Sequence, residues 1–176
     1  MRVIAGQFRS RLLKSVPGFD TRPTPDRLRE TLFNVLAPRI EGVSFVDAYA
    51  GTGAVGIEAL SRGAARAVFI ERSRAALAVL RENLHSLDLL RSSNIVAGKA
   101  AAVVAQYPAD IVFLDPPYEH EREYSACLEA LSPTPPPLVI AQHASRFDLA
   151  PEWGRLRRVR LLKQGDNSLS FFTPAL

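Results

Sequence analysis

Hydrophobic and polar positions along the chain follow two repeats, one typical of buried strands and one typical of helices. Short apolar runs bounded by turn residues predict strands at 43–47, 67–71, 94–97, 110–114, 138–142, 157–164 and 168–173. Apolar residues at helical spacing cover 53–61, 73–87, 100–106 and 122–131. Strands that alternate with helices form parallel sheets covered on both faces, so the pattern predicts an α/β fold with a mostly parallel seven-stranded sheet.

A further helix is predicted before the first strand. Thr24 can act as its N-cap, Pro25 suits its first position, and the helix is expected to end before Pro38. At the other end of the chain, the sequence Gly-Asp-Asn at 165–167 has the composition of a turn between the last two strands. The sheet is therefore expected to close with an antiparallel C-terminal hairpin.

The first residues differ from the rest in composition. Residues 2–14 contain two short apolar patches around Gly6, which predict a short N-terminal β-hairpin or a bent extended arm. The cations of this segment have no acidic residue among them: Arg2, Arg9, Arg11 and Lys14. We therefore expect two units, a basic hairpin arm at 1–20 and an α/β domain at 21–176.

A glycine-rich turn lies between the first strand of the domain and the helix that follows it. Gly51, Gly53 and Gly56 spell G-x-G-x-x-G, and Glu71 follows Gly51 at about the 20-residue spacing of the dinucleotide-binding fingerprint. Glycine lets the backbone pass close to a ligand, and the helix start offers free amide groups. The motif alone is also compatible with glycines that only allow tight packing of a strand on a helix.

Acidic residues at two strand ends distinguish between cofactors. Asp47 lies at the carboxyl end of its strand, just before the glycines, where a carboxylate attracts the ammonium of a methionine group and repels a pyrophosphate. Glu71 ends the next strand, where it can bind both hydroxyls of a ribose; the alternative is a surface ion pair with Arg72 or Arg74. Together the two carboxylates favour S-adenosylmethionine over NAD.

The sequence Asp115-Pro-Pro-Tyr118 follows a buried strand, at the edge where open parallel sheets bind ligands. Asp115 and the carbonyl of Pro116 can both accept hydrogen bonds from an exocyclic amine, which leaves the nitrogen lone pair free to face a methyl donor. Tyr118 offers an aromatic face on which a base can stack. This combination predicts methyl transfer to an amino group; the alternative is a plain turn after a strand.

Composition narrows the class of protein further. The chain has 22 Lys and Arg residues against 18 Asp and Glu residues, a charge of +4 that permits a polyanionic partner without establishing one. Cys127 is the single cysteine, which excludes an internal disulfide, and no apolar run is long enough for a membrane helix. We expect a cytoplasmic protein with no membrane segment. The three histidines lack metal-ligand spacing, so no metal is expected.

With these motifs the chain resembles the class I S-adenosylmethionine-dependent methyltransferases that act on amino groups, which have a Rossmann-like fold. Residues 2–6 and 21–34 narrow the resemblance to the RsmD family of bacterial small-subunit (16S) ribosomal RNA guanine-N2 methyltransferases, over nearly the whole chain. The resemblance implies methyl transfer from S-adenosylmethionine to the N2 amine of a guanine. The implied partner is the small ribosomal subunit or its RNA, and we expect a monomer.

Three groups of residues follow from the motifs and the resemblance. The expected catalytic residues are Asp115, Pro116 and Tyr118. Expected cofactor contacts are Asp47, Ala50, Gly51, Gly53, Glu71, Arg72, Lys99, Ala100 and Asp115. Lysine at 99 departs from the acidic or amide residue that many class I enzymes use for adenine, and lysine has no acceptor. Adenine recognition is therefore expected from backbone groups near Lys99 and Ala100.

Substrate contacts are expected from Arg9, Arg11, Arg22, Thr24, Arg27 and Tyr118. For the residues at 22–27, a capped helix followed by a surface salt bridge is the alternative. Other functions compatible with the motifs are an adenine-N6 DNA methyltransferase, a protein glutamine methyltransferase, an NAD-dependent oxidoreductase and a non-enzymatic RNA-binding module. The oxidoreductase leaves the sequence at 115–118 unexplained, and the binding module does not need it.

Overall fold

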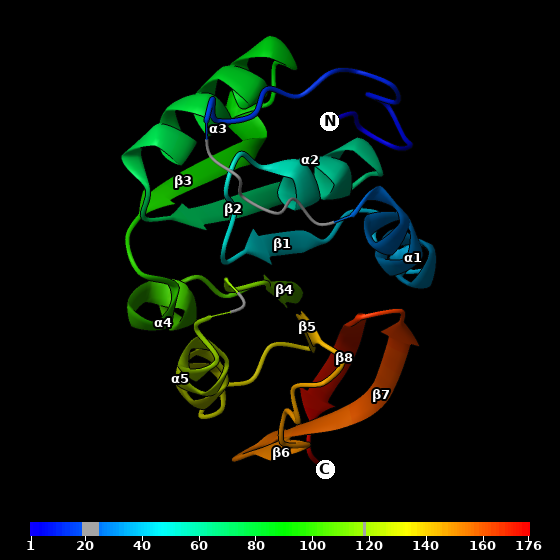
Figure 1. Ribbon diagram of the computed structural model, residues 1–176, viewed down its shortest axis with the longest axis vertical. Coiled ribbons are helices and arrows are strands. Elements are labelled where there is room, and N and C mark those ends of the chain that lie inside the picture. The colour runs from blue at the N-terminus through cyan, green and yellow to red at the C-terminus, as the bar shows by residue number, and fades with distance from the viewer. Residues whose placement is uncertain (19–24, 118) are drawn as a thin grey trace.

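A computed structural model describes residues 1–18, 25–117 and 119–176. Within these residues the strands form one sheet of eight, in the order β3-β2-β1-β4-β5-β8-β7-β6 (Figure 1). The first five strands are parallel, and β8, β7 and β6 continue the sheet in antiparallel pairs. The strands are β1 Ser44–Asp47, β2 Arg66–Glu71, β3 Ser93–Ala97, β4 Ile111–Leu114, β5 Leu138–Ala144, β6 Glu152–Trp153, β7 Leu156–Gln164 and β8 Asn167–Pro174.

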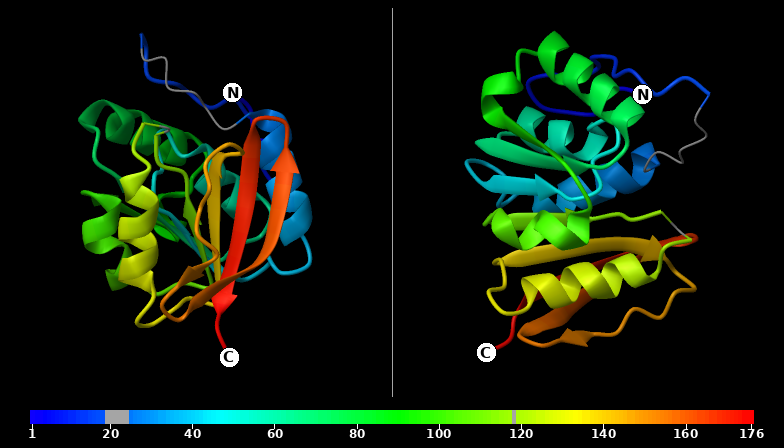
Figure 2. Two further views of the ribbon diagram at one scale, coloured as in Figure 1. Left: turned by 60° about the horizontal axis from the view of Figure 1, so that its bottom comes forward. Right: turned by 90° about the vertical axis from the view of Figure 1, so that its left-hand side faces the viewer.

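Helices cover both faces of this sheet. Successive side chains of a strand point to opposite faces, so Phe45 packs with the buried residues of α1, α2 and α3, while Val46 packs with those of α4 and α5. Figure 2 shows α1 and α5 on opposite sides of the sheet. The helices are α1 Asp26–Leu36, α2 Ala54–Ser61, α3 Arg74–Ser86, α4 Ala100–Val103 and α5 Arg122–Leu131, with short 3₁₀ turns at Leu90–Ser92 and Val104–Gln106.

The predicted helices and strands of the domain are confirmed, and most boundaries shift by one or two residues. The helix expected at 100–106 is α4 followed by the 3₁₀ turn Val104–Gln106. The sheet has eight strands and not the expected seven, because the two-residue strand β6 pairs with Leu156 and Arg157 at the outer side of β7. Pro25 is the N-cap of α1 and not its first residue. Thr24, the expected cap, lies outside the described residues.

The N-terminal arm forms an antiparallel pairing, but a single isolated bridge between Arg2 and Leu12 takes the place of a regular hairpin. The arm bends back on the domain instead. Val3 and Leu13 are buried in the same core cluster as Phe45. The backbone N–H groups of Ile4 and Ala5 donate to the two carboxylate oxygens of Glu58, which is fully buried in α2.

Candidate active site

The sheet brings three acidic residues to one edge. Asp47 ends β1, Glu71 ends β2, and Asp115 directly follows β4. These three strands are adjacent and parallel, so their carboxyl ends share an edge. The order of the strands reverses between β1 and β4. From β1 the chain adds β2 and β3 on one side, and it then adds β4 and β5 on the other side. Such a switch point is where open α/β sheets bind ligands.

The three glycines between β1 and α2 serve different purposes. Gly51 has φ +56°, and a Cβ there would meet no atom within 4 Å, so this part of the loop is open for a ligand. Gly53 has φ +98°, and a Cβ there would lie 2.5 Å from Cδ1 of Leu80 in α3. A Cβ on Gly56 would lie 2.3 Å from the Phe69 ring in β2, so Gly56 allows α2 to pack on the sheet.

Asp47 carries the clearest electrostatic signal of the site. Its side chain is buried; Oδ2 accepts a hydrogen bond of 3.0 Å from the N–H of Gly56, and Oδ1 has no hydrogen-bond partner among the described residues. Burial, together with the nearby carboxylates of Asp115 and Glu71, raises the pKa of Asp47 to about 7. A buried, unsatisfied carboxylate oxygen among acidic neighbours fits a positively charged ligand group such as the ammonium of S-adenosylmethionine.

Glu71 lies at the same edge and next to the glycine loop. Burial raises its pKa, while the backbone N–H groups of Ser73, Arg72 and Gly51 and the charge of Arg72 oppose the shift. The ion pair with Arg72 or Arg74, the alternative explanation for this residue, is not among the ion pairs of the described residues. Its position next to Gly51 is what a ribose ligand would require of it.

The other expected cofactor residues surround these two carboxylates in the fold. Ala50 is buried in the glycine loop, and its N–H donates to the carbonyl of Ile70. Arg72 follows β2 and is exposed. Lys99 is the exposed N-cap of α4, whose first residue Ala100 is buried, so this helix begins just beyond the carboxyl end of β3.

Asp115 and Pro116 occupy the expected place beyond β4. Asp115 is half-buried and Pro116 is buried. The charge of Asp115 acts on Asp47, which places the expected catalytic carboxylate near the expected cofactor carboxylate. Tyr118, Arg22 and Thr24, all expected at the site, lie outside the described residues.

Most cations of the arm have partners on the domain or within the arm itself. Arg2 donates to the carbonyl of Ser10, Arg11 donates to the carbonyl of Ser86 at the end of α3, and Lys14 pairs with Glu82. Arg9 is exposed, as is Arg27 on α1. Bonds to carbonyl groups leave the charge of an arginine uncompensated, so Arg2, Arg9 and Arg11 keep the arm electropositive.

Two contacts that the sequence analysis did not identify hold the glycine loop in position. Asn83 of α3 accepts from the N–H of Lys14 and donates to the carbonyls of Lys14 and Thr52, so it joins the arm to the loop. On the other side, the hydroxyl of Tyr49 donates to Glu123 at 2.8 Å and lies 3.1 Å from the sulfur of Cys127. Residue type and spacing gave no signal for either contact, because each joins elements far apart in the chain.

A buried charge pair holds the arm on α1 and α2: Glu58 accepts from the N–H groups of Ile4 and Ala5, and Arg29 donates to the carbonyl of Arg2. Arg29 in α1 and Glu58 in α2 are both fully buried, with 3.9 Å between the guanidinium Nε and the carboxylate, and Arg62 approaches the same carboxylate to 2.9 Å. Each of the two residues lies within the apolar face of its helix. Charged residues are rarely buried unless they are paired, so an arginine and a glutamate on apolar helix faces could have been predicted to pair from the sequence.

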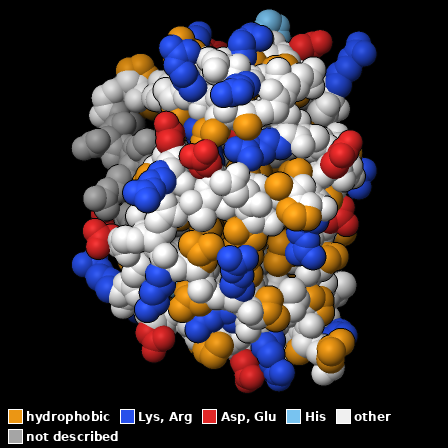
Figure 3. All heavy atoms as spheres, turned by 90° about the vertical axis from the view of Figure 1, so that its right-hand side faces the viewer, with side chains coloured by type: hydrophobic (Ala, Val, Ile, Leu, Met, Phe, Trp, Pro, Cys, Tyr) orange, Lys and Arg blue, Asp and Glu red, His pale blue; other side chains and the backbone are white. Residues whose placement is uncertain are grey.

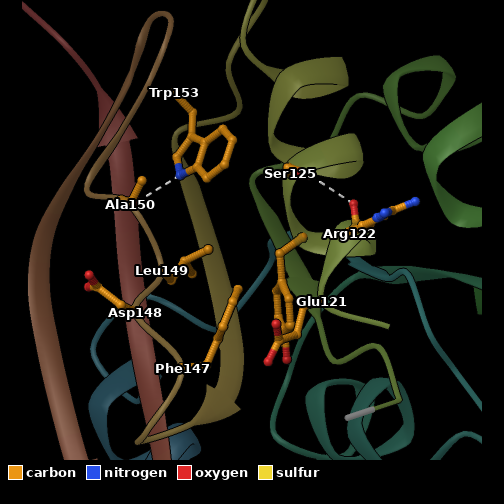
Figure 4. Close-up of a pocket in the computed structure, with 9 residues that line it drawn as sticks. Glu121, Arg122, Ser125, Phe147, Asp148, Leu149, Ala150 and Trp153 are labelled. Carbon is orange, nitrogen blue, oxygen red and sulfur yellow. Dashed lines mark hydrogen bonds between the residues drawn. The ribbon is translucent and has the colours of Figure 1, made fainter. Parts of the chain in front are cut away.

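A cavity of about 250 Å³ lies beside α5, on the side of the segment that follows β5 (Figure 4). Phe147, Leu149 and Trp153 lie across from Ser125 of the helix. Tyr124 also lines the cavity, with its ring centroid 5.4 Å from that of Phe147. The indole N–H of Trp153 donates to the carbonyl of Ala150, and the hydroxyl of Tyr124 donates to the carbonyl of Gln142. None of the acidic residues at 47, 71 and 115 lines this cavity, so it is separate from the candidate site.

The described residues contain no group of three or more His, Cys, Asp or Glu side chains that could hold a metal ion. Within the same residues, no helix combines the length and the apolar character that crossing a bilayer requires.

Solved structures share this fold over all or most of the chain. The structure of the Escherichia coli protein yhhF has a TM-score of 0.86 and 32% identity, and covers 100% of this chain and 98% of its own. An RNA methyltransferase from Salinibacter ruber in complex with S-adenosyl-L-homocysteine has a TM-score of 0.67 and 17% identity, over 87% of this chain and 94% of its own. The fold and the acidic edge with its glycine loop define a class I S-adenosylmethionine-dependent methyltransferase.

The chain belongs to the family described as Conserved hypothetical protein 95, whose family model matches residues 1–173. It is similar to the ribosomal RNA small subunit methyltransferase D of Escherichia coli strain K12, with 46% identity over 120 residues. That alignment covers 67% of this chain and 60% of the relative. The matched part is therefore less than two thirds of the length of that relative.

Proposed function

We propose that the protein transfers a methyl group from S-adenosylmethionine to the N2 amine of a guanine in small-subunit ribosomal RNA. The observation that carries the proposal is the position of Asp115 and Pro116 at the carboxyl end of β4, near Asp47. The similarity to a ribosomal RNA small subunit methyltransferase supports the choice of RNA and of the small subunit. The partner is then the small ribosomal subunit or its RNA, bound by a monomer.

The chain supplies two hydrogen-bond acceptors that orient the target amine in this reaction. The carboxylate of Asp115 and the carbonyl of Pro116 accept hydrogen bonds from the target amine, so its lone pair is directed at the methyl group. Bound S-adenosylmethionine would supply the methyl group: the N–C bond would form as the C–S bond breaks with its electrons moving to sulfur, and the proton released by the amine would pass to water, directly or by way of the Asp115 carboxylate. No acid needs to protonate the leaving sulfur, which is neutral after transfer.

Cofactor contacts are proposed for the loop and strand ends around this position. Asp47 binds the ammonium group, and Gly51 and Gly53 let the loop approach the methionine part. Glu71 binds the ribose, with Ala50 and Arg72 beside it. Backbone groups at Lys99 and Ala100 bind adenine at the start of α4. Tyr118 stacks on the target base.

The experiment that tests the function is methyl transfer from labelled S-adenosylmethionine to small ribosomal subunits that lack the modification. We expect label in one guanine of the ribosomal RNA, located by mapping the modified nucleotide and identified as N2-methylguanine after digestion. DNA and protein fractions serve as controls. Label at adenine N6 in DNA or on a glutamine side chain would replace the proposal by one of those alternatives.

A first prediction concerns the arm, which we propose as a contact for RNA phosphates. Each phosphate contact that a cation makes releases counterions, so the logarithm of affinity falls with the logarithm of salt concentration by about 0.7 to 0.9 per contact. Replacing Arg9 by alanine should lower the magnitude of this slope by about 0.7 to 0.9, the value for one contact. The double replacement of Arg9 and Arg11 should lower it by about 1 to 2. Binding to unmodified small subunits over a salt series measures the slope.

Cofactor affinity should stay unchanged in the Arg9 variant, because this side chain has no contact with the glycine loop. Since Arg11 also bonds the carbonyl of Ser86, the single Arg9 variant separates loss of charge from loosening of the arm. Equal slopes for the parent and the Arg9 variant would exclude Arg9 as a phosphate contact.

A further inference from the structure

The strand β7 and the residues before it form a second basic segment that the proposed function does not use. No acidic residue lies between Trp153 and Gly165. We name its five cations the β7 basic strip: Arg155, Arg157, Arg158, Arg160 and Lys163.

Most of this charge is uncompensated. Arg157 is the member of the strip that has an acidic partner among the described residues, Glu152 at 3.6 Å, and both side chains of that pair are largely exposed. Arg155 and Arg158 donate to carbonyl groups, which leaves their charge in place. Arg160 lies over the ring of Phe171 at 5.8 Å, and Lys163 is exposed.

The strip leads to the edge of the sheet that carries Asp115. β7 and β4 run in the same direction, because β5 pairs parallel with β4 and antiparallel with β8, and β8 pairs antiparallel with β7. The turn after β7 is held at this edge by the hydrogen bond from the N–H of Ser145 to the carbonyl of Asp166. Three strand spacings, about 14 Å, separate β7 from β4. RNA with its target base at Asp115 can therefore reach the Lys163 end of the strip with a nearby nucleotide.

Apolar side chains are exposed between these cations. Val159 is 61% exposed and Leu161 40% exposed. In Figure 3, hydrophobic and cationic side chains mix over the lower half of the face, where Figure 1 places β7 and β8. Charges on an outer strand can serve only to prevent sheets from joining edge to edge. That role accounts for the cations but not for the exposure of Val159 and Leu161. Leu161 lies on the same face of the strand as Lys163, where a ribose or base surface could cover it.

We propose that the β7 basic strip binds the phosphodiester backbone of the RNA that carries the target base. The proposal rests on the proposed function, since it assumes an RNA substrate at Asp115. It adds a second contact surface at the β7 end of the sheet, whereas the arm packs on α2 and α3 toward the other end.

The test compares two double variants with the same loss of charge. Arg160→Gln with Lys163→Gln removes two charges from the strip. The control, Arg81→Gln with Arg91→Gln, removes two exposed charges from α3 and the turn after it, next to β3 at the other end of the sheet. Binding to unmodified small-subunit RNA over a salt series should give a slope lower by about 1 to 2 units for the strip variant and the parent slope for the control. Lys163→Glu alone, which alters no internal contact, should weaken binding at low salt.

The outcomes separate this proposal from its alternatives. Equal slopes for the strip variant and the parent would overturn it, as would an equal decrease in both double variants, which would reflect net charge alone. Self-association of the strip variant with an unchanged slope would assign the cations to edge protection and also overturn it. Failure of the proposed function would be visible separately, because the parent protein would then transfer no methyl group to unmodified subunits.

Discussion

Replacing Asp115 by alanine should lower the rate of methyl transfer about 100 to 1,000-fold and leave the affinity for S-adenosylmethionine nearly unchanged. Loss of one preorganised hydrogen bond to the reacting group typically costs about 3 to 4 kcal/mol in the transition state. Single-turnover rates on unmodified small subunits, together with calorimetry of cofactor binding, measure the two quantities.

The electrostatics of the site give this prediction an internal control. The charge of Asp115 raises the pKa of Asp47, so its removal should favour the ionised form of Asp47 and should not weaken binding of a cationic ligand group. Loss of cofactor binding in parallel with rate would show that Asp115 holds the cofactor and not the amine. Asp115→Asn keeps an acceptor oxygen and should retain more activity than Asp115→Ala.

Replacing Glu71 by alanine should weaken S-adenosylmethionine binding by about 10 to 150-fold, the equivalent of roughly 1.5 to 3 kcal/mol for a charge-assisted hydrogen-bonded contact. The carboxylate lies next to Gly51 and lacks an arginine partner within ion-pair distance in the described part of the chain. Calorimetric titration with S-adenosylmethionine and with S-adenosylhomocysteine checks the effect. A dissociation constant equal to that of the parent would mean that Glu71 has a structural role only.

At the methionine end of the cofactor, the test compares how the affinity for S-adenosylmethionine depends on pH in the parent and in Asp47→Asn. With a pKa of about 7 in the free protein, Asp47 is largely protonated below pH 7 and gains its charge as the pH rises. A bound ammonium favours the charged form, so affinity should rise by up to about tenfold per pH unit from pH 5 toward 7 and then level off. Asp47→Asn should bind more weakly at pH 7 and lose most of this dependence. An identical pH profile in both proteins would contradict the assignment.

Much of the fold could be predicted because the strands are apolar and short and the helices have a regular apolar face. β1, β2 and β4 are buried, so their sequences carry the pattern of a doubly covered sheet. β6 has two residues, too few for any repeat, and forms because Trp153 pairs with Leu156 across a tight turn. The path of the arm is set by hydrogen bonds to Glu58 and Ser61 of α2, which lie more than 50 residues away in sequence. Local composition could therefore indicate that the arm bends, but not which residues of the domain it contacts.

The candidate site was predictable where a side chain sits at the end of a strand. The positions of Asp47, Glu71 and Asp115 follow from strand direction alone, because parallel strands end at one edge. The roles of the neighbours do not follow in the same way. The fingerprint treats Gly51 and Gly56 alike, but one faces open space and the other a phenylalanine ring. Asn83 has no motif around it, and its three hydrogen bonds arise from tertiary packing.

The way the arm docks limits how its contribution to RNA binding can be studied. Without the first residues, the carboxylate of Glu58 would lose two backbone donors and the buried guanidinium of Arg29 would lose the carbonyl of Arg2. Glu58 would keep Arg29 and Arg62 as charged partners, but each buried polar group left without its hydrogen bond typically costs about 1 to 3 kcal/mol. A truncated protein would therefore report a damaged interior as well as a missing contact surface. Surface charges of the intact arm, such as Arg9, can be changed without that cost.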